Sequence, residues 1–526
     1  MAGSRGPDNG LKFYDLSQPW GFGTPVWPGY EGVRLEQGAY HARHGTLTQR
    51  FTTVMHAATH VNAPVHLVPM GSDIASLPVD HFFGPGVVLS IPKGKWELIE
   101  ASDLQAAGAH VRPGDIVLIN TGWHHRWSDS YAYFGEAPGL ALSAANWLIE
   151  RKVKMVGVDL PAIDHPLATS LGLHRNGPID KRVVDNFKRE TGKEPKAAFP
   201  DWNPAHRALL EAGIPTVEEA GGEIDALAGK RATICALPWR WTTGDASIVR
   251  LVGIVDTNKS GDGRDGVAPV LHDLTHPWGH DASFWPGKNP IHDFRRLYYH
   301  ARDGMFVQQF TTVMHRGTHM DAPIHVLENM PDISQFELSR FFGTGVAVSI
   351  PKKKWEVITA KDLEGARPRI EPGDIVMINT GFHRIYGDNP DYYAYSPGLY
   401  KEAAEWLVER GVKMVGIDVQ ALDHPLGTYL APHGPGPIQP HLNDEYRAET
   451  GRDILEDFPL WEPAHKALLS NGIPGIENIG GALDAVTGKR CTFMAFPWRW
   501  TNGDGSGVRV VAIDESNGSV KIEAGA

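Results

Sequence analysis

The chain has 526 residues, 42% of them hydrophobic and 21% charged, which fits a globular protein with room for two domains. Its net charge of −12 would repel phosphate backbones, so we expect no nucleic-acid partner. No apolar run approaches the ~20 residues that cross a bilayer, and residues 1–15 lack the apolar core of a signal peptide, so we expect a cytoplasmic protein without a membrane partner.

The sequence contains two copies of one domain-sized repeat. Val-Met-His at 54–56 recurs at 313–315, Gly-Asp-Ile-Val at 114–117 recurs at 373–376, and Pro-Trp-Arg-Trp at 238–241 recurs at 497–500. Agreement at a nearly fixed offset indicates tandem duplication. The polar, glycine-rich stretch 257–266 is the expected linker between domains 1–256 and 267–526.

Within each half, short apolar runs alternate with helical patterns. The first half suggests a strand at 115–120, a helix at 143–151, a strand at 154–159 and a helix at 204–212. The second half repeats this with a helix at 401–410, a strand at 413–418 and a helix at 463–471. Both late helices open with proline and are followed by glycine, the usual start and stop residues. We therefore predict the α/β class.

Residues 313–325 carry the most informative pattern. His315, His319, Asp321 and His325 all occupy odd positions, so an extended segment would turn them to one face, and Gly317 would leave room for an ion between the first two histidines. Two imidazoles and a carboxylate suit Zn²⁺ or Mn²⁺. With only two cysteines in the chain, a thiolate cluster is excluded. A helix face or hydrogen-bonded core histidines are the alternatives.

This segment resembles the His-x-Gly-Thr-His-x-Asp-x-Pro-x-His signature of the cyclase family, which includes kynurenine formamidase and isatin hydrolase. The likeness extends to Asp-Leu-Thr-His-Pro at 273–277, Phe-Trp-Pro-Gly at 284–287 and the closing Ala-His-x-Ala-Leu-Leu segment. The resemblance implies two homologous swivelling β/β/α (cyclase-like) domains in tandem. It also implies that His315, His319 and Asp321 hold a metal, and that His465 and Glu477 complete a second metal position or act on water.

The activity implied by the resemblance is metal-assisted cleavage of an amide bond. Glu477 would be a ligand or orient the water, and His325 would exchange a proton with the leaving nitrogen, unless it only supports the loop after Pro323. Trp278, Trp285 and Trp498 could pack the core or bind a small planar substrate: a cyclic amide, an N-formyl aromatic amine or a lactone. Alternatives are a non-hydrolytic cyclase or dehydratase, a protein that sequesters its ligand, and a structural metal site.

The first half carries an altered copy of the motif. It keeps three histidines and the later His–Glu pair, but Asn62 replaces the aspartate and Ala58 replaces the glycine; the corresponding residues are His56, His60, Asn62, His66, His206 and Glu218. We expect this half to bind metal weakly or not at all and to complete the pocket of the other half as an intrachain pseudo-dimer. Two working sites are the competing interpretation, and homo-oligomers of the whole chain stay open.

The repeated Asp-His-Pro at 164–166 and 423–425 follows a predicted strand end, a common place for functional loops. A turn that ends in proline explains it equally well.

Overall fold

The computed structural model describes residues 10–258, 269–286, 292–516 and 522–525. Each half builds a nine-stranded mixed sheet, so the α/β class and the two cyclase-like units are confirmed. The first sheet has the order β1 (Leu11–Asp15), β13 (Val252–Asp256), β11 (Arg231–Cys235), β5 (Phe83–Ser90), β7 (Ile116–Asn120), β9 (Met155–Val158), β10 (Thr216–Glu218), β4 (His60–Asn62) and β12 (Ala246–Ile248).

The second sheet repeats this order strand for strand. It runs β14 (Val270–Asp273), β26 (Val511–Asp514), β24 (Arg490–Met494), β18 (Phe342–Ser349), β20 (Ile375–Asn379), β22 (Met414–Ile417), β23 (Gly475–Glu477), β17 (His319–Asp321) and β25 (Gly505–Gly507). The four strands from β18 to β23 are parallel, and the flanking pairs are antiparallel. The parallel strands are buried along their whole lengths apart from Thr344 and Ser349 of β18, which explains their largely apolar sequences.

Helices predicted from the sequence are present within a residue or two of their expected bounds. They are α4 (Leu142–Glu150) and α7 (Pro204–Glu211) in the first half, and α12 (Lys401–Arg410) and α15 (Pro463–Ser470) in the second. The other helices of more than five residues are α2 (Ala101–Ala107), α5 (Lys181–Thr191), α10 (Ala360–Gly365) and α13 (His441–Thr450). Shorter ones are α3 (Tyr131–Gly135), α6 (Pro195–Ala198), α11 (Pro390–Tyr393), α14 (Ile454–Asp457) and α16 (Leu483–Val486). Two small parallel pairs complete the set, β6 (Leu98–Ile99) with β8 (Gly139–Leu140) and β19 (Val357–Ile358) with β21 (Gly398–Leu399).

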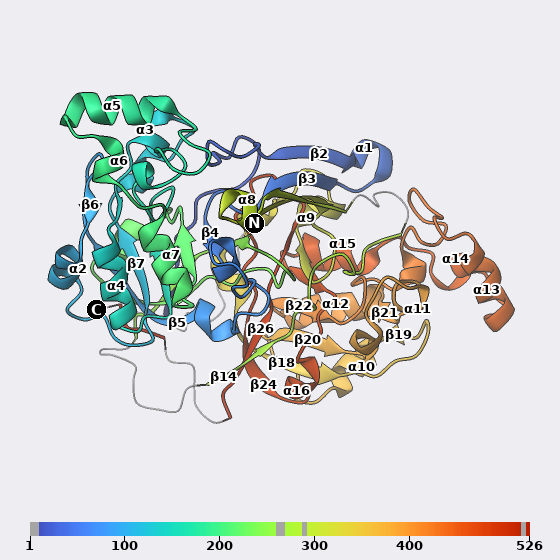
Figure 1. Ribbon diagram of the computed structural model, residues 1–526. Helices are drawn as coiled ribbons and strands as arrows, with labels where there is room; N and C mark the ends of the chain where they lie inside the picture. Colours follow the sequence, from blue (N-terminus) through green and yellow to red (C-terminus); the bar gives the residue numbers. More distant parts are fainter. Residues whose placement is uncertain (1–9, 259–268, 287–291, 517–521, 526) are drawn as a thin grey trace.

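The two halves share one further sheet. Its order is β15 (Asp293–Tyr298), β16 (Val307–Val313), β3 (Thr48–Val54) and β2 (Arg34–Ala39), so two strands come from each half. At its centre β16 pairs with β3, and the Thr52 and Thr311 hydroxyls lie 2.8 Å apart. Figure 1 shows the blue β2–β3 arm, with the short helix α1 (His41–His44) at its tip, reaching over the second half.

Behind this shared sheet lies an aromatic core made by both halves. The indoles of Trp239 and Trp498 stack with their centroids 4.6 Å apart, and Trp20 meets Trp500 edge-on at 5.1 Å. All four side chains are at most 4% exposed. Burying such large rings accounts for a substantial part of the association between the halves.

The last described residues, 522–525, pack against the first half. Arg231 donates to Asp115 and to Glu523, and the backbone nitrogen of Asp256 donates to the Glu523 carbonyl. Figure 1 accordingly places the C-terminal end among the first-half elements. Residues 259–266 of the expected linker lie outside the described residues, and the domain limits stay predictions. No helix in the described ranges is long and apolar enough to cross a membrane.

Candidate metal centre and active site

The four residues of the second-half motif converge, but they do so along a bent path. Only His319 and Asp321 lie on a strand, β17, two positions apart and on one face. His315 precedes that strand, and His325 follows it in the short helix α9 (Pro323–Val326). His315 Nδ1 lies 2.7 Å from Asp321 Oδ1, and the His315 and His325 rings stack at 3.9 Å. The expected single extended segment is therefore replaced by a turn, a strand and a helical turn.

The backbone conformation at position 317, rather than the space that an ion needs, explains the glycine there. Its φ of +61° lies in the left-handed region, and a Cβ there would meet Trp278 at 3.0 Å and the Tyr386 hydroxyl at 3.3 Å. Ala58 holds the equivalent position in the first half with φ 54°. The expectation that this position leaves room beside a metal is wrong, because its missing side chain would point toward an aromatic wall.

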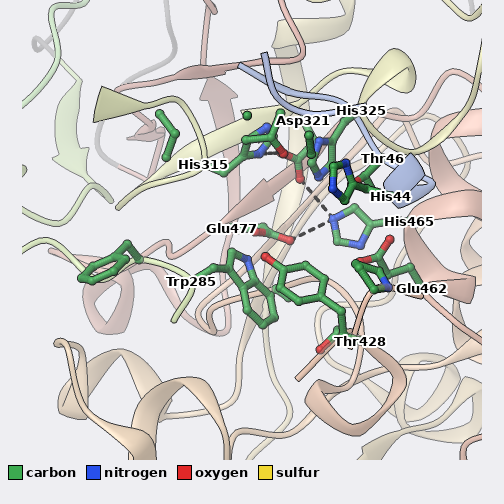
Figure 2. Close-up of a pocket in the computed structure, with 18 residues that line it drawn as sticks. His44, Thr46, Trp285, His315, Asp321, His325, Thr428, Glu462, His465 and Glu477 are labelled. Atoms are coloured by element: carbon green, nitrogen blue, oxygen red, sulfur yellow. Dashed lines mark hydrogen bonds and ion pairs between the residues drawn. The ribbon is translucent and has the colours of Figure 1, made fainter. Parts of the chain in front are cut away.

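His465 and Glu477, twelve residues apart in sequence, meet at the motif. His465 Nε2 lies 3.1 Å from Asp321 Oδ2 and 3.0 Å from Glu477 Oε1, as Figure 2 shows with dashed lines. Glu477 sits on β23 directly opposite His319 on β17, with 3.3 Å between Glu477 Oε2 and His319 Nε2. Both residues are buried, so neither is the exposed surface group that its sequence context alone indicates.

Hydrogen bonds from outside the cluster fix which ring nitrogen of each histidine faces inward. Asp423 accepts from His465 Nδ1 at 2.6 Å, the Gly317 carbonyl accepts from His319 Nδ1 at 2.8 Å, and Asp504 accepts from His315 Nε2 at 2.8 Å. The inward-facing atoms are therefore His465 Nε2, His319 Nε2 and His315 Nδ1. Such outer hydrogen bonds are typical of histidines that bind metals.

The carboxylates of the cluster favour the protonated, positively charged forms of His315 and His319. Burial lowers the pKa of His319, but Asp321 and Glu477 outweigh that effect and raise the pKa to about 10. Burial likewise lowers the pKa of His315, while Asp504 and Asp321 raise it to about 9. His325, with Nδ1 donating to the Leu47 carbonyl at 2.6 Å, is different: burial lowers its pKa to about 4.

The donor set fits a divalent cation. His319 Nε2 and Asp321 Oδ1 are buried and 3.4 Å apart, and neither forms a hydrogen bond of good geometry among the described residues, although His315 Nδ1 and Glu477 Oε2 lie close by. Leaving such atoms unpaired costs about 1–3 kcal/mol each, and one shared cation would satisfy both. Two sets have ligand atoms that lie within 4.8 Å of one another, and both include Asp321: His315–Asp321–His325 and His319–Asp321–Glu477.

A pocket of about 900 Å³, part of it open to solvent, leads to this cluster. One wall is aromatic, with Trp285 and Tyr429 at a centroid distance of 5.3 Å, and Phe284 beside them. Glu462 also lines the pocket, and burial raises its pKa to about 7. Figure 2 shows Trp285 below the His–Asp cluster and Glu462 beside His465. Pro435, from the proline-rich loop 432–437, also lines the pocket.

Part of the pocket belongs to the first half. Gly38, Ala39, His44, Thr46 and Thr48 line it, all from the β2–α1–β3 arm. Figure 2 places His44 and Thr46 next to His325.

Further cross-half contacts position the cluster. Gln49 accepts from the backbone nitrogen of Asp504 and donates its own backbone nitrogen to the Asp504 carboxylate, both at 3.1 Å. Asp504 in turn holds His315, and Leu47 holds His325. The geometry of the second-half site therefore depends on first-half residues.

Of the three tryptophans expected at the substrate, the structure brings only Trp285 to the pocket. Trp278 packs against Trp239 at 4.8 Å, and Trp498 stacks on Trp239, both inside the core between the halves. Neither is more than 4% exposed. Duplication explains this placement, because Trp498 stacks on its repeat equivalent Trp239, and the Trp278–Trp239 contact mirrors that of Trp20 with Trp498.

In the first half, the equivalent side chains are hydrogen-bonded to one another. Asn62 donates to Glu218 at 3.0 Å and to the Thr216 hydroxyl at 3.3 Å, and His206 Nε2 lies 2.8 Å from the same hydroxyl. The second half has Gly475 where Thr216 stands. Burial lowers the pKa of His206 to about 4. The pocket here is smaller, about 540 Å³.

The first-half histidines that remain also differ in charge. Burial is the main cause that lowers the pKa of His56 and of His66 well below the usual value, and no aspartate at position 62 opposes it. His60 Nε2 still lies 3.1 Å from Glu218. His56, His66 and Asp245 keep ligand atoms within 4.8 Å of one another. This half therefore retains part of a metal-binding geometry.

Two site residues are not recognisable from the motif alone. Asp504 follows Gly503, and the pair recurs as Gly244–Asp245 after the repeated Trp-Arg-Trp, so the repeat itself marks it. Asp423, part of the repeated Asp-His-Pro that fits a functional loop and a proline-ended turn equally well, accepts from His465 and from the backbone nitrogens of Ala464 and His465. The carboxylate satisfies free N–H groups at the start of α15, 41 and 42 positions further along the chain, and in the sequence only its recurrence as Asp164 marks it.

Comparison with known proteins finds the Cyclase family model twice, over residues 14–165 and 272–424. The chain is 26% identical over 239 residues to a kynurenine formamidase from Bacillus cereus, covering 45% of this chain and 95% of that protein. It is 25% identical over 247 residues to a kynurenine formamidase from Erythrobacter litoralis, covering 46% and 93%. The double match agrees with tandem duplication.

Solved structures of similar fold include an isatin hydrolase bound to the product analogue thioisatinate. That chain has a TM-score of 0.39 and 19% identity, with 47% of this chain and 93% of that chain covered. Isatin hydrolase A from Ralstonia solanacearum gives a TM-score of 0.37 and 21% identity, covering 47% and 92%.

Proposed function

This chain belongs to the Cyclase family, and from that premise we propose that its second half is a metal-dependent hydrolase. It cleaves a carbon–nitrogen amide bond in a small planar substrate, a cyclic amide or an N-formyl aromatic amine. The observation that carries this proposal is the buried cluster of His315, His319 and Asp321 at an aromatic-walled pocket. The curated relatives named as kynurenine formamidases support the choice of an amide.

The residues proposed to hold the cation are His315, His319 and Asp321, with His465 and Glu477 adjacent. A bound Mn²⁺ or Zn²⁺ supplies a Lewis acid that activates water and polarises a carbonyl. Asp504, Asp423 and the Gly317 carbonyl hold the three imidazoles in the tautomers that turn a lone pair toward Asp321 and Glu477. These contacts fix ligand orientation before substrate arrives.

His325 is the proposed proton carrier. Its Nδ1–H donates to the Leu47 carbonyl, so the neutral ring presents Nε2 as the atom that accepts a proton and later returns it to the leaving nitrogen. Burial holds the ring neutral near pH 7, which keeps that nitrogen available. Glu477 Oε1 accepts from the Leu422 backbone nitrogen, so this carboxylate is held in place to bind metal or orient water.

Substrate shape follows from the pocket walls. Trp285 and Tyr429 lie at 38° to each other in one wall, and a flat ring packed against that wall would lie beside the His–Asp cluster. Thr46, Thr428 and Glu462 supply polar groups for the edges of that ring. This arrangement favours a ring-bearing amide over an extended chain.

The first half is proposed to act as the partner of the second rather than as a second enzyme. Its Asn62 donates Nδ2 to Thr216 and Glu218, and Asn62 offers a cation no second carboxylate oxygen. Its β2–α1–β3 arm lines the second-half pocket. The chain is thus proposed to be a covalent pseudo-dimer. Full activity would need both halves.

Hydrolysis is tested with N-formylanilides and cyclic imides in ¹⁸O-labelled water, with and without added Mn²⁺ or Zn²⁺ after chelation. We expect metal-dependent turnover with the label in the carboxylate product. Turnover that survives complete removal of metal would overturn the assignment.

The same substrate panel separates the alternatives. A lactone turned over faster than every amide would point to a lactone hydrolase, and product without ¹⁸O would point to a cyclase or dehydratase. Ligand bound but unchanged after long incubation with metal would indicate a sequestering protein.

The division of labour is tested with Asp321→Asn, which copies the residue of the first half, and the reciprocal Asn62→Asp. We expect Asp321→Asn to lose at least about 100-fold in kcat/KM, a typical cost for a group that acts on the reacting atoms, together with metal from the second-half site. Asn62→Asp should add metal to the first half. Residual full activity in Asp321→Asn would show that the first half is itself an enzyme.

A further inference from the structure

A second group of metal-binding side chains lies in the first half, outside both pockets. His124 and His125 belong to the helical turn η3 (Trp123–Arg126), and Asp225 belongs to η5 (Ile224–Leu227). Their ligand atoms lie within 4.8 Å of one another. His125 Nε2 is 2.9 Å and His124 Nε2 is 3.4 Å from the same oxygen, Asp225 Oδ2. The Nε2 atoms of both imidazoles thus lie close to one carboxylate oxygen, Asp225 Oδ2.

His124 is held as metal-binding histidines usually are. Its Nδ1–H donates to buried Asp159 at 2.9 Å, which leaves Nε2 with the lone pair. That Nε2 is buried and has no hydrogen-bond partner among the described residues, and the residue as a whole is 7% exposed. Asn120 donates to the other Asp225 oxygen, Oδ1, at 2.8 Å and so orients Oδ2 toward the rings.

We propose that the first half binds one Zn²⁺ ion through His124 Nε2, His125 Nε2 and Asp225 Oδ2. Two imidazoles and a carboxylate are ligands that Zn²⁺ accepts, and three protein ligands leave a position for water. The site links η3, which follows β7, to η5, which precedes β11, so the ion binds only the folded first half. Its occupancy therefore stabilises that half.

The duplicated second half supplies an internal comparison. There His383 donates to Asp418 at 2.9 Å, and its Nε2 lies 3.3 Å from Asp484, as in the first half. The second imidazole is replaced by Arg384, whose guanidinium contacts Asp484 at 2.7 Å. A fixed positive charge thus occupies the place where the first half has His125. In the second half, the positive charge beside the His–Asp pair is thus an arginine side chain. Only the first half leaves this place open to a metal ion.

The test counts Zn²⁺ per chain by equilibrium dialysis and elemental analysis of the full chain. The variants are His125→Arg, which copies the second half, and Arg384→His, which copies the first. We expect His125→Arg to bind one ion fewer than wild type and Arg384→His one ion more. The increase in Tm on adding Zn²⁺ to chelated protein should shrink in His125→Arg, while its Tm in chelator stays at the wild-type value.

An equal number of ions in wild type and in folded His125→Arg overturns the proposal and leaves a His125–Asp225 ion pair. Should His125→Arg fail to fold, Arg384→His decides: an additional ion supports the site, and no additional ion overturns it. Asp321→Asn keeps this inference separate from the proposed activity. Its loss of metal from the second half should leave the His125-dependent ion in place.

Discussion

At position 62 an amide nitrogen stands where position 321 offers a second carboxylate oxygen. In the second half, Asp321 faces three histidines and raises the pKa of His315 and His319 against the effect of burial. In the first half, Asn62 instead donates to Glu218. The exchange of one carboxylate oxygen for an amide nitrogen thus removes the negative charge that the second-half histidines face and replaces it with a hydrogen-bond donor.

His325→Ala should separate proton transfer from metal binding. Because His325 Nδ1 is occupied by the Leu47 carbonyl, Nε2 is the atom lost to catalysis. We expect kcat to fall by about 10²–10⁴-fold, the usual contribution of a positioned acid or base, while metal content per chain is unchanged. His66→Ala, the first-half equivalent, is the matched control and should keep wild-type kcat. Loss of metal from His325→Ala would identify the residue as a ligand instead.

The strained backbone at position 317 can be tested by its effect on the free energy of unfolding. Gly317→Ala places a methyl 3.0 Å from Trp278 at a φ of +61°, so we expect unfolding free energy to fall by about 1–2 kcal/mol. Ala58→Gly relieves the same backbone strain in the first half and should cost nothing or stabilise slightly. Denaturant titration measures both. A Gly317→Ala variant that is as stable as wild type, together with an Ala58→Gly variant that is less stable, would show that the backbone tolerates this conformation without strain.

At the scale of elements, each nine-stranded sheet has a half-buried lysine just before one of its parallel strands. Lys413 precedes β22 and donates to the Phe342 carbonyl at 2.6 Å, and Lys154 precedes β9 and donates to the Phe83 carbonyl at 2.7 Å. Burial lowers the pKa of each to about 8. These ammonium groups satisfy carbonyls at the strand starts, but their burial has an electrostatic cost.

That cost predicts a pH-dependent stability. The folded pKa of about 8 lies below the unfolded value of about 10.4, so the unfolded chain binds more protons between these pH values and stability rises with pH there. Relative to Lys413→Met, wild type should gain about 1–2 kcal/mol of unfolding free energy between pH 7.5 and 9.5. Denaturant titrations at the two pH values test this. Parallel behaviour of the two proteins would contradict it.

At the scale of the whole molecule, the two halves form one unit by sharing a sheet and an aromatic core. β3 and β16 pair across the halves, and Trp239 stacks on Trp498. We expect a chain cut at a protease site inserted between residues 258 and 269 to stay associated on size exclusion and to keep its activity. Separation of the halves, or the isolated second half retaining full activity, would contradict the proposed pseudo-dimer.

The sequence alone determined the duplication, the α/β class and the principal helices, because each depends on a local pattern or on a repeat at fixed offset. It also brought His315, His319, Asp321, His465 and Glu477 together as candidates, through a family motif. These features need no knowledge of how distant segments pack.

The tertiary structure decided what depends on contacts between distant residues. It placed Trp278 and Trp498 in the core between the halves, gave Gly317 a backbone role, and added Asp504, Asp423 and the first-half arm to the site. Burial and hydrogen bonding between distant segments set these roles, as for Gln49 and Asp504, which lie 455 positions apart. No local pattern encodes such pairs, because packing of the two halves creates them.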